Sequence, residues 1–289
     1  MRVDFGNKLV GFLGAARGRK RRLAVFALGL AAAGGFALAQ GKPNTAGMKP
    51  QAIEVSSGPV NSFLKSGEAR TRFGKLEWKG GVVLASQSSS FGGLSGLVLD
   101  SEGKRLLAIS DAGTWLSAEV VRNKGRIAGL KHVRVGPLKA RGNKPLVRNN
   151  DRDSEALALS SGTLANGTAL IAFEKNNRIG SFVVEDGEIG PPASYLKMPP
   201  YYRRFWNDGI EAVTVLRAGP LKGAIVAFSE HRLRGRDDMT GWIWIGTEPM
   251  PFTVAANGEY QITDAAALAD GGLLIHERSF SWAEGVRMR

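Results

Sequence analysis

The chain has 289 residues, of which 43% are hydrophobic, so it is long and apolar enough to bury a sizeable core. It contains no cysteine, which excludes disulfides, thiolate metal sites, cysteine nucleophiles and lipid attachment through cysteine. The formal net charge of +13 falls to +7 when residues 1–39, with seven basic residues and one acid, are set aside. A surplus of this size favours anionic substrates, lipid head groups or acidic polymers. No basic block with interleaved aromatic residues is found after the leader, so no nucleic-acid partner is predicted.

The first predicted element is an export leader. Basic residues 17–22 precede an apolar run over 23–39, and Ala37-Leu38-Ala39 then forms a cleavage pattern before Gln40. The run is short and weakly hydrophobic for a spanning helix. We therefore predict a signal peptide over 1–39 and a periplasmic or secreted protein that touches the membrane only transiently, through this segment. An uncleaved N-terminal anchor is the alternative.

Residues 40–67 are rich in Pro, Gly, Ser, Asn and Lys, a composition that predicts a flexible linker. The folded domain is therefore expected to span residues 68–289.

An internal repeat is the main feature of the predicted domain. Each repeat has a short apolar strand, a turn that usually contains glycine, a second apolar strand and then an acid. The final acids fall at positions 111, 174, 230 and 277, so successive spacings are 63, 56 and 47 residues. Such periods, stretched by loop insertions, are typical of propeller blades. The four repeats are residues 94–111, 153–174, 209–230 and 262–277.

The apolar runs of the repeats distinguish two all-β architectures. They are almost continuously apolar, as expected of strands that stacked blades cover on both faces. A β-sandwich, the alternative, would show alternating apolar and polar residues. We therefore predict an all-β chain that forms a β-propeller with about five or six blades.

The acids of the repeats are the candidate functional residues. Equivalent positions in successive blades converge on the central channel of a propeller, so these carboxylates are expected to share one site. Gly96 stands in place of an acid at the start of the first repeat. The acids that end the second strand are Asp111, Glu174, Glu230 and Glu277, and those that open the first strand are Glu155, Glu211 and Asp264.

Carboxylates gathered in one site repel each other, and three arrangements would offset that repulsion. A hard cation such as Ca²⁺ would bind their oxygens; basic neighbours would pair with them; or one carboxyl would keep a proton through a raised pKa. A purely structural role, in salt bridges and in capping strand-end amides, is the alternative for each acid. The residues expected to bind the metal are Asp111, Asp153, Glu155 and Glu211, and the basic candidates are Arg152, Lys175, Arg178 and Arg278.

Serine catalysis is not expected. Ser95, within Gly93-Leu94-Ser95-Gly96, misses the G-x-S-x-G pattern, and the strand–turn–helix context of a nucleophile elbow is absent.

Six short motifs lie between residues 70 and 289: FGKLEW at 73–78, FGGLSGL at 91–97, ISDAGTW at 109–115, DSEAL at 153–157, GIEA at 209–212 and ERSF at 277–280. Together they resemble the phytase-like family, also called the "esterase-like activity of phytase" family. The resemblance implies an exported bacterial propeller with an acidic, calcium-dependent site. Members of that family continue past the glutamate–arginine motif with further strands, so the last blade of this chain is expected to be incomplete.

The acids and the resemblance together predict a monomeric, metal-assisted hydrolase of small anionic phosphoester or ester substrates. A bound cation would polarise the substrate and activate water. One alternative is a non-catalytic propeller that binds a ligand or protein in the periplasm; another is a lactonase-like propeller with a single calcium ion and no arginine clamp. The expected catalytic residues are Asp111, Glu155, Glu174, Glu211, Glu230 and Glu277, and the expected anion-binding residues are Arg152, Lys175, Arg178 and Arg278.

Overall fold

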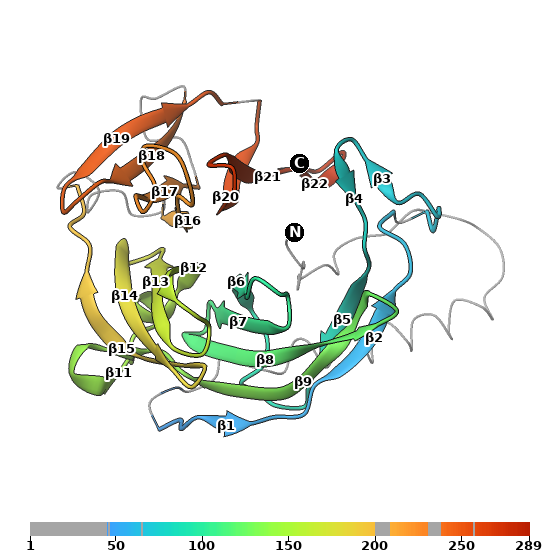
Figure 1. Cartoon of the computed structure of the whole chain (residues 1–289), viewed down its shortest axis with the longest axis horizontal. Coiled ribbons are helices and arrows are strands. Elements are labelled where there is room, and N and C mark those ends of the chain that lie inside the picture. The colour runs from blue at the N-terminus through green and yellow to red at the C-terminus, as the bar shows by residue number, and fades with distance from the viewer. Residues whose placement is uncertain (1–44, 46, 65, 200–208, 231–237, 257) are drawn as a thin grey trace.

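Four antiparallel sheets are arranged around a common centre as the blades of a β-propeller (Figure 1). The computed structural model describes residues 45, 47–64, 66–199, 209–230, 238–256 and 258–289. The predicted fold class is confirmed. The described residues form four blades, however, rather than the expected five or six, because the chain before residue 89 forms short ribbons and not a further blade.

Each blade begins with its innermost strand, and the following strands lie progressively further out. Blade 1 consists of β6 (Leu94–Leu99), β7 (Arg105–Ser110), β8 (Thr114–Asn123) and β9 (Arg126–Pro137). Blade 2 consists of β12 (Ser154–Gly162), β13 (Gly167–Phe173), β14 (Arg178–Glu185) and β15 (Glu188–Tyr195). Blade 3 consists of β16 (Ile210–Val215), β17 (Ile225–Ser229), β18 (Met239–Trp244) and β19 (Pro249–Val254). Blade 4 has three strands, β20 (Gln261–Ala267), β21 (Leu273–Ser281) and β22 (Gly285–Met288).

The segment expected to be a linker is partly strand. Strand β1 (Gln51–Ala52) pairs with β9 at the outer edge of blade 1, and β2 (Ser56–Val60) pairs with β5 (Gly81–Ala85). A short ribbon of β3 (Arg72–Phe73) and β4 (Leu76–Glu77) lies between them in sequence. Met48, Ile53 and Val55 pack with β5 against the apolar face of blade 1, and this burial accounts for the order in a glycine- and serine-rich stretch.

The segment between blades 1 and 2 leads into the centre of the propeller. It contains the ribbon of β10 (Lys139–Ala140) and β11 (Lys144–Pro145), with the 3-10 turn η1 (Arg141–Asn143) at its tip. The single-turn helix α2 (Asn149–Arg152) then brings the chain to the start of β12.

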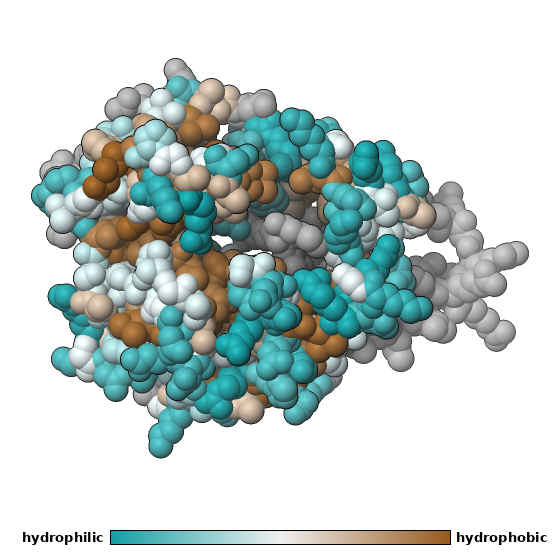
Figure 2. Space-filling view, in the orientation of Figure 1, coloured by the Kyte–Doolittle hydropathy of each residue, from teal (hydrophilic) through white to brown (hydrophobic). Residues whose placement is uncertain are grey.

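Hydrophobic seams hold neighbouring blades together. Ile109 and Trp115 of blade 1 pack against Phe173 of blade 2, and Val226 of blade 3 packs with Ile262 of blade 4. Between blades 2 and 3 the seam includes Trp242, and hydrophobic residues gather there in Figure 2. The second strands β7, β13 and β17 are buried along almost their whole length, as their continuous apolar runs predict for strands covered on both faces.

Blade 4 is covered on one side only. Its strand β21 exposes Leu274 and Phe280, and Trp282 just beyond it is 91% exposed. Within the described part of the chain, no buried hydrophobic cluster joins blade 4 to blade 1 as clusters join the other neighbours.

The predicted signal peptide over 1–39 lies outside the described residues. Among the residues that the structure does describe, no helix has both the length and the apolar character needed to cross a membrane.

Replacing the Trp242 side chain tests the seam between blades 2 and 3. Trp242 is fully buried, so Trp242→Ala should lower the free energy of unfolding by about 3–5 kcal/mol through lost burial and an unfilled cavity. Trp282→Ala removes the same side chain from an exposed position and should change it by less than about 0.5 kcal/mol. Urea unfolding of both variants measures the difference, and equal effects would contradict the assigned seam.

Candidate functional site

A β-bulge at the start of every innermost strand positions the first set of site residues. In each blade the pairing with the second strand skips one residue, between Leu94 and Gly96 in blade 1 and at matching places in the others. A bulged residue is left out of the ladder, and its side chain is redirected. The four bulged residues are Ser95, Glu155, Glu211 and Thr263.

These pairings change the equivalences expected from the sequence. Glu155 and Glu211 are equivalent, as predicted, but their counterparts are Ser95 and Thr263 rather than Gly96 and Asp264. The reason is that the sequence comparison matched acid with acid, whereas equivalence is set by strand pairing, which places Ser95 and Thr263 at the bulge.

The second set follows the second strand of each blade. In each blade one residue of the second strand pairs with the residue just before the bulge; these residues are Ser110, Phe173, Ser229 and Glu277. The residues that follow them in sequence are therefore equivalent from blade to blade. In the first three blades the backbone N–H of this equivalent residue donates a hydrogen bond to the chain just before the innermost strand. The acceptors are the carbonyl oxygens of residues 93, 153 and 209, at 3.0, 2.9 and 3.1 Å. The equivalent residues are Asp111, Glu174, Glu230 and Arg278.

Arg278, and not Glu277, therefore occupies this position in blade 4. Glu277 lies one residue earlier and pairs with Arg289, at 2.7 Å between Oε2 and Nε. Arg278 instead reaches the preceding blade, where its Nη2 lies 3.0 Å from Oε1 of Glu230.

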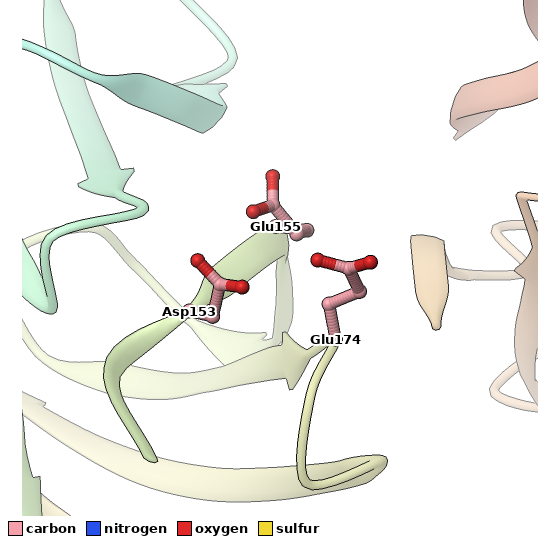
Figure 3. Close-up of side chains that lie close together, drawn as sticks. All are labelled: Asp153, Glu155 and Glu174. Atoms are coloured by element: carbon pink, nitrogen blue, oxygen red, sulfur yellow. The ribbon is translucent and has the colours of Figure 1, made fainter. Parts of the chain in front are cut away.

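Five acids from blades 2 and 3 form the core of the site, and we call them the site carboxylates. They fall into two groups, and within each group one carboxylate oxygen of every residue lies within 4.8 Å of the others. Glu174 belongs to both groups. Figure 3 shows the three side chains of the first group directed toward one another. The first group is Asp153, Glu155 and Glu174, and the second is Glu174, Glu211 and Glu230.

Two cations lie at opposite ends of the site carboxylates. Lys175 Nζ is 2.7 Å from Asp153 Oδ2 in the first group, and Arg278 contacts Glu230 in the second. Both basic side chains remain nearly half exposed, at 46% and 45%. Five carboxylates against these two cations leave a formal charge of −3 when all are ionised, so the site favours a bound cation or retained protons.

Burial and like charge raise the pKa of two site carboxylates. Desolvation raises the pKa of Glu211 well above its usual 4.5, and the charges of Glu155, Glu230 and Glu174 raise it further, against a small opposing effect of Arg278. The pKa of Glu174 is also raised, first by burial and then by a hydrogen bond with Asp153. Protons are therefore held most readily at Glu211 and Glu174, where burial and like charge outweigh the effect of the nearby basic side chains.

Gly209 provides the space that Glu174 occupies. A β-carbon at position 209 would lie 2.0 Å from Cγ of Glu174 and 2.7 Å from its Cα, which is closer than atoms can approach. Because Gly209 immediately precedes β16, this contact also sets how closely blades 2 and 3 approach at the site.

The remaining predicted site residues lie outside the two groups. Asp111 belongs to neither, although it directly follows β7 at the position equivalent to Glu174. Arg152 is buried and donates through Nη2 to the carbonyl oxygen of Val147 at 2.7 Å, and Arg178 stacks over the ring of Phe173 at 3.8 Å. Both arginines thus have structural contacts where anion binding was expected.

The site carboxylates fit a hard divalent cation. Every donor is an oxygen, the donors form two compact groups, and Glu211 lies deep among like charges. Ca²⁺ takes six to eight such oxygen ligands. Asp153, Glu155 and Glu211 were expected as ligands, and Glu174 and Glu230 were expected as catalytic residues of the same site, whereas the position of Asp111 outside the groups comes from the structure.

Comparison with protein families gives one match. The model of the phytase-like family, "Esterase-like activity of phytase", matches residues 89–289, which includes all four blades and every site carboxylate. The chain belongs to the phytase-like family. Three of the motifs that carry the family resemblance, at 91–97, 153–157 and 209–212, contain the start of an innermost strand and its bulge.

Other comparisons add little for this phytase-like protein. No curated protein matches the chain. A solved structure titled "Structure of U3-55K" is similar at 11% identity with a TM-score of 0.38, covering 68% of this chain and 51% of that one. The chain thus spans about half the length of that structure, and a similarity so weak supports no statement about function.

The raised pKa of Glu211 predicts how stability depends on pH in the presence of EDTA. Between its ordinary value near 4.5 and the raised folded value, the folded protein keeps a proton that the unfolded chain releases. Stability should therefore fall as the pH rises through that interval, by about 1.4 kcal/mol for each pKa unit of difference. Glu211→Gln should remove much of this fall, as measured by urea unfolding from pH 4 to pH 8.

The control for this experiment is Glu248→Gln. Glu248 lies at the surface, 64% exposed and paired with Lys197, so its variant should keep the wild-type dependence on pH. Identical curves for wild type and Glu211→Gln would show that Glu211 ionises normally in the folded protein.

Gly209→Ala tests the contact between blades 2 and 3 at the site. The added β-carbon must displace Glu174, so the free energy of unfolding should fall by about 1–3 kcal/mol, as for other overpacked sites. Gly246→Ala places the same methyl group where no atom lies within 4 Å and should be tolerated. Thermal unfolding compares the two, and a stable Gly209→Ala protein would mean that Glu174 has room to move.

Proposed function

We propose that this phytase-like protein is an exported, metal-assisted hydrolase of anionic phosphoester or ester substrates. One observation carries the proposal: Glu174 is shared by two groups of carboxylates that together bridge blades 2 and 3. An arrangement of this kind suits one or two divalent cations, and divalent cations assist hydrolysis at many phosphatase sites.

Each part of the site has a role in this proposal. The site carboxylates would hold Ca²⁺, which when bound would supply Lewis-acid polarisation of the substrate and activation of water. Lys175 and Arg278 lie on either side and keep exposed surface, so they can contact the anionic group while still paired with Asp153 and Glu230. These cations favour a phosphoester over a neutral ester.

Proton transfer is assigned to the centre of the site. A general base works best when its pKa lies near the working pH. Among the site carboxylates, Glu174 and Glu211 have raised pKa values while no cation is bound, and a bound cation would lower them. The proton of the attacking water would therefore pass to whichever of these two carboxylates does not ligate the cation. Burial at the centre also strengthens the electrostatic contacts to a substrate.

Export belongs to the proposal and is supported by the leader sequence over residues 1–39. Calcium is abundant outside the cytoplasm, where weak extracellular sites bind it at about 10⁻⁴–10⁻³ M. A site of crowded carboxylates needs no tighter affinity there.

The full-length protein tests the proposal with p-nitrophenyl phosphate and p-nitrophenyl acetate as probes, with Ca²⁺ or EDTA. We expect Ca²⁺ to raise the melting temperature, because a ligand of the folded state stabilises it. We expect phosphate ester cleavage that EDTA abolishes, and Glu174→Gln should reduce both the stabilisation and the rate, the rate by about 100-fold or more.

Glu248→Gln is the matched control and should behave as wild type, because Glu248 lies far out on the exposed side of blade 3. Glu277→Gln gives a second comparison, since it removes an acid that the sequence predicted as catalytic but that pairs with Arg289. Absence of both calcium stabilisation and hydrolysis would overturn the proposal and favour a non-catalytic binding propeller.

A further inference from the structure

The positive charge of the folded part of the chain is concentrated in one segment. Residues 120–150 contain nine Lys and Arg and no Asp or Glu. Residues 40–289 carry a net charge of +7, so the rest of that part is net −2. We call the nine side chains the basic rim: Arg122, Lys124, Arg126, Lys131, Arg134, Lys139, Arg141, Lys144 and Arg148.

The basic rim is elongated. It follows the end of β8 and the whole of β9 along the outer part of blade 1, and then the ribbon of β10 and β11, which lies beside β15 of blade 2 (Figure 1). Strand β9 alone has 12 residues, which corresponds to about 40 Å at about 3.3 Å per residue. All of the basic residues except the half-buried Lys139 are exposed. Such a surface suits an extended partner better than a compact one.

Few of these side chains form ion pairs, and the nearby carboxylates of Glu185, Asp186 and Glu188 gather in one hollow with Lys139. Lys131 pairs with Glu119 and Arg134 with Glu188, but the other seven make no ion pair with a carboxylate among the described residues. Two of the seven are held in place by the backbone: Arg122 donates to the carbonyl oxygen of Gly103 and Arg141 to that of Ala193, each at 3.1 Å. The rim therefore presents positioned positive charge to solvent.

The residue types of the segment narrow the chemistry of the partner. Residues 120–150 contain no Phe, Tyr or Trp, so His132 is the single aromatic ring of the segment on which a base could stack. Its exposed large hydrophobic residue is Val147, too little apolar surface for insertion into a bilayer. Arg and Lys remain as the recognition groups, and both bind phosphate oxygens well.

We propose that the basic rim binds a linear, flexible phosphate polymer through its backbone charge. A flexible chain can follow the edge of a twisted blade, whereas a rigid duplex or a flat membrane would meet only part of it. This inference goes beyond the proposed hydrolase and does not depend on it, because none of the site carboxylates belongs to the rim.

Binding of fluorescently labelled long-chain polyphosphate to the full-length protein in EDTA tests the inference, with anisotropy measured over a range of KCl concentrations. The rim variant is Arg126→Ser/Lys144→Ser/Arg148→Ser, which removes three exposed side chains without an ion pair among the described residues. We expect at least tenfold weaker binding at 0.1 M salt. The slope of log K against log salt concentration should fall by about 2, since each lost phosphate contact contributes about 0.7.

Two matched variants remove the same charge elsewhere. Arg72→Ser/Lys75→Ser/Lys222→Ser lies off the rim, and Arg19→Ser/Lys20→Ser/Arg21→Ser lies in the leader; both should bind within about twofold of wild type. An equal loss in either variant would overturn the inference in favour of general charge attraction. The three single rim variants, each expected to give about a third of the change in slope, serve if the triple variant unfolds.

Three further outcomes decide the class of partner. No binding of polyphosphate by the wild type would overturn the inference, and so would tighter binding of double-stranded DNA or of vesicles rich in anionic lipid. Glu174→Gln should bind polyphosphate with wild-type affinity, so failure of the hydrolase proposal and failure of this one give different results.

Discussion

Repulsion among the carboxylates around Glu174 is the constraint against which the centre of the propeller is built. Two like charges 4 Å apart repel by about 4 kcal/mol at an effective dielectric constant of 20. The hydrophobic seams supply the opposing energy, since each fully buried large apolar side chain contributes about 1.5–3 kcal/mol. Trp242, Phe173 and Phe228 are among the side chains with no exposed surface. Burial between the blades thus holds the acids at distances they would not adopt freely.

The placement of positive charge shows where that repulsion remains. Lys175 and Arg278 neutralise the two ends of the row of site carboxylates. Lys175 directly follows an acid of the repeat, and Arg278 stands in blade 4 where the other blades have that acid. Glu211 lies between them, and its pKa is raised well above the ordinary value. The centre is therefore the part of the site where protonation and metal binding compete, because both remove the same excess of negative charge.

The fold could be predicted from the sequence because its signal is repeated. Apolar strands bounded by glycine recur four times, each recurrence forms a blade, and in blades 1 to 3 the second strand is buried on both faces. The convergence of Glu155, Glu174, Glu211 and Glu230 followed from the same repeat. The order of residues 51–60 could not be predicted, because polar strands gain their order from the apolar face of blade 1 and not from their own composition.

The exact set of site residues could not be predicted, because a bulge and a one-residue offset leave the apolar pattern unchanged. Asp264 was grouped with Glu155, but the residue equivalent to Glu155 in blade 4 is Thr263. Glu277 was grouped with Glu230, but the residue equivalent to Glu230 is Arg278. Likewise, nothing in the sequence distinguishes Arg178, stacked on Phe173, from Arg278, which reaches Glu230. These differences depend on pairing register and on contacts between residues far apart in sequence.

The bulge recurs in all four blades, yet its side chain is Ser, Glu, Glu and Thr in turn. The backbone geometry thus tolerates a carboxylate or a hydroxyl without change to the ladder. Position 95 already lies against blade 2, where the Ser95 hydroxyl donates to the carbonyl oxygen of Ser154 at 2.5 Å. The four bulged positions at the centre of the propeller can therefore carry different side chains, so one substitution there changes the local chemistry and leaves the scaffold intact. This separation of backbone geometry from side-chain chemistry makes the centre of the propeller well suited to redesign, since new sets of metal-binding side chains can be introduced one blade at a time.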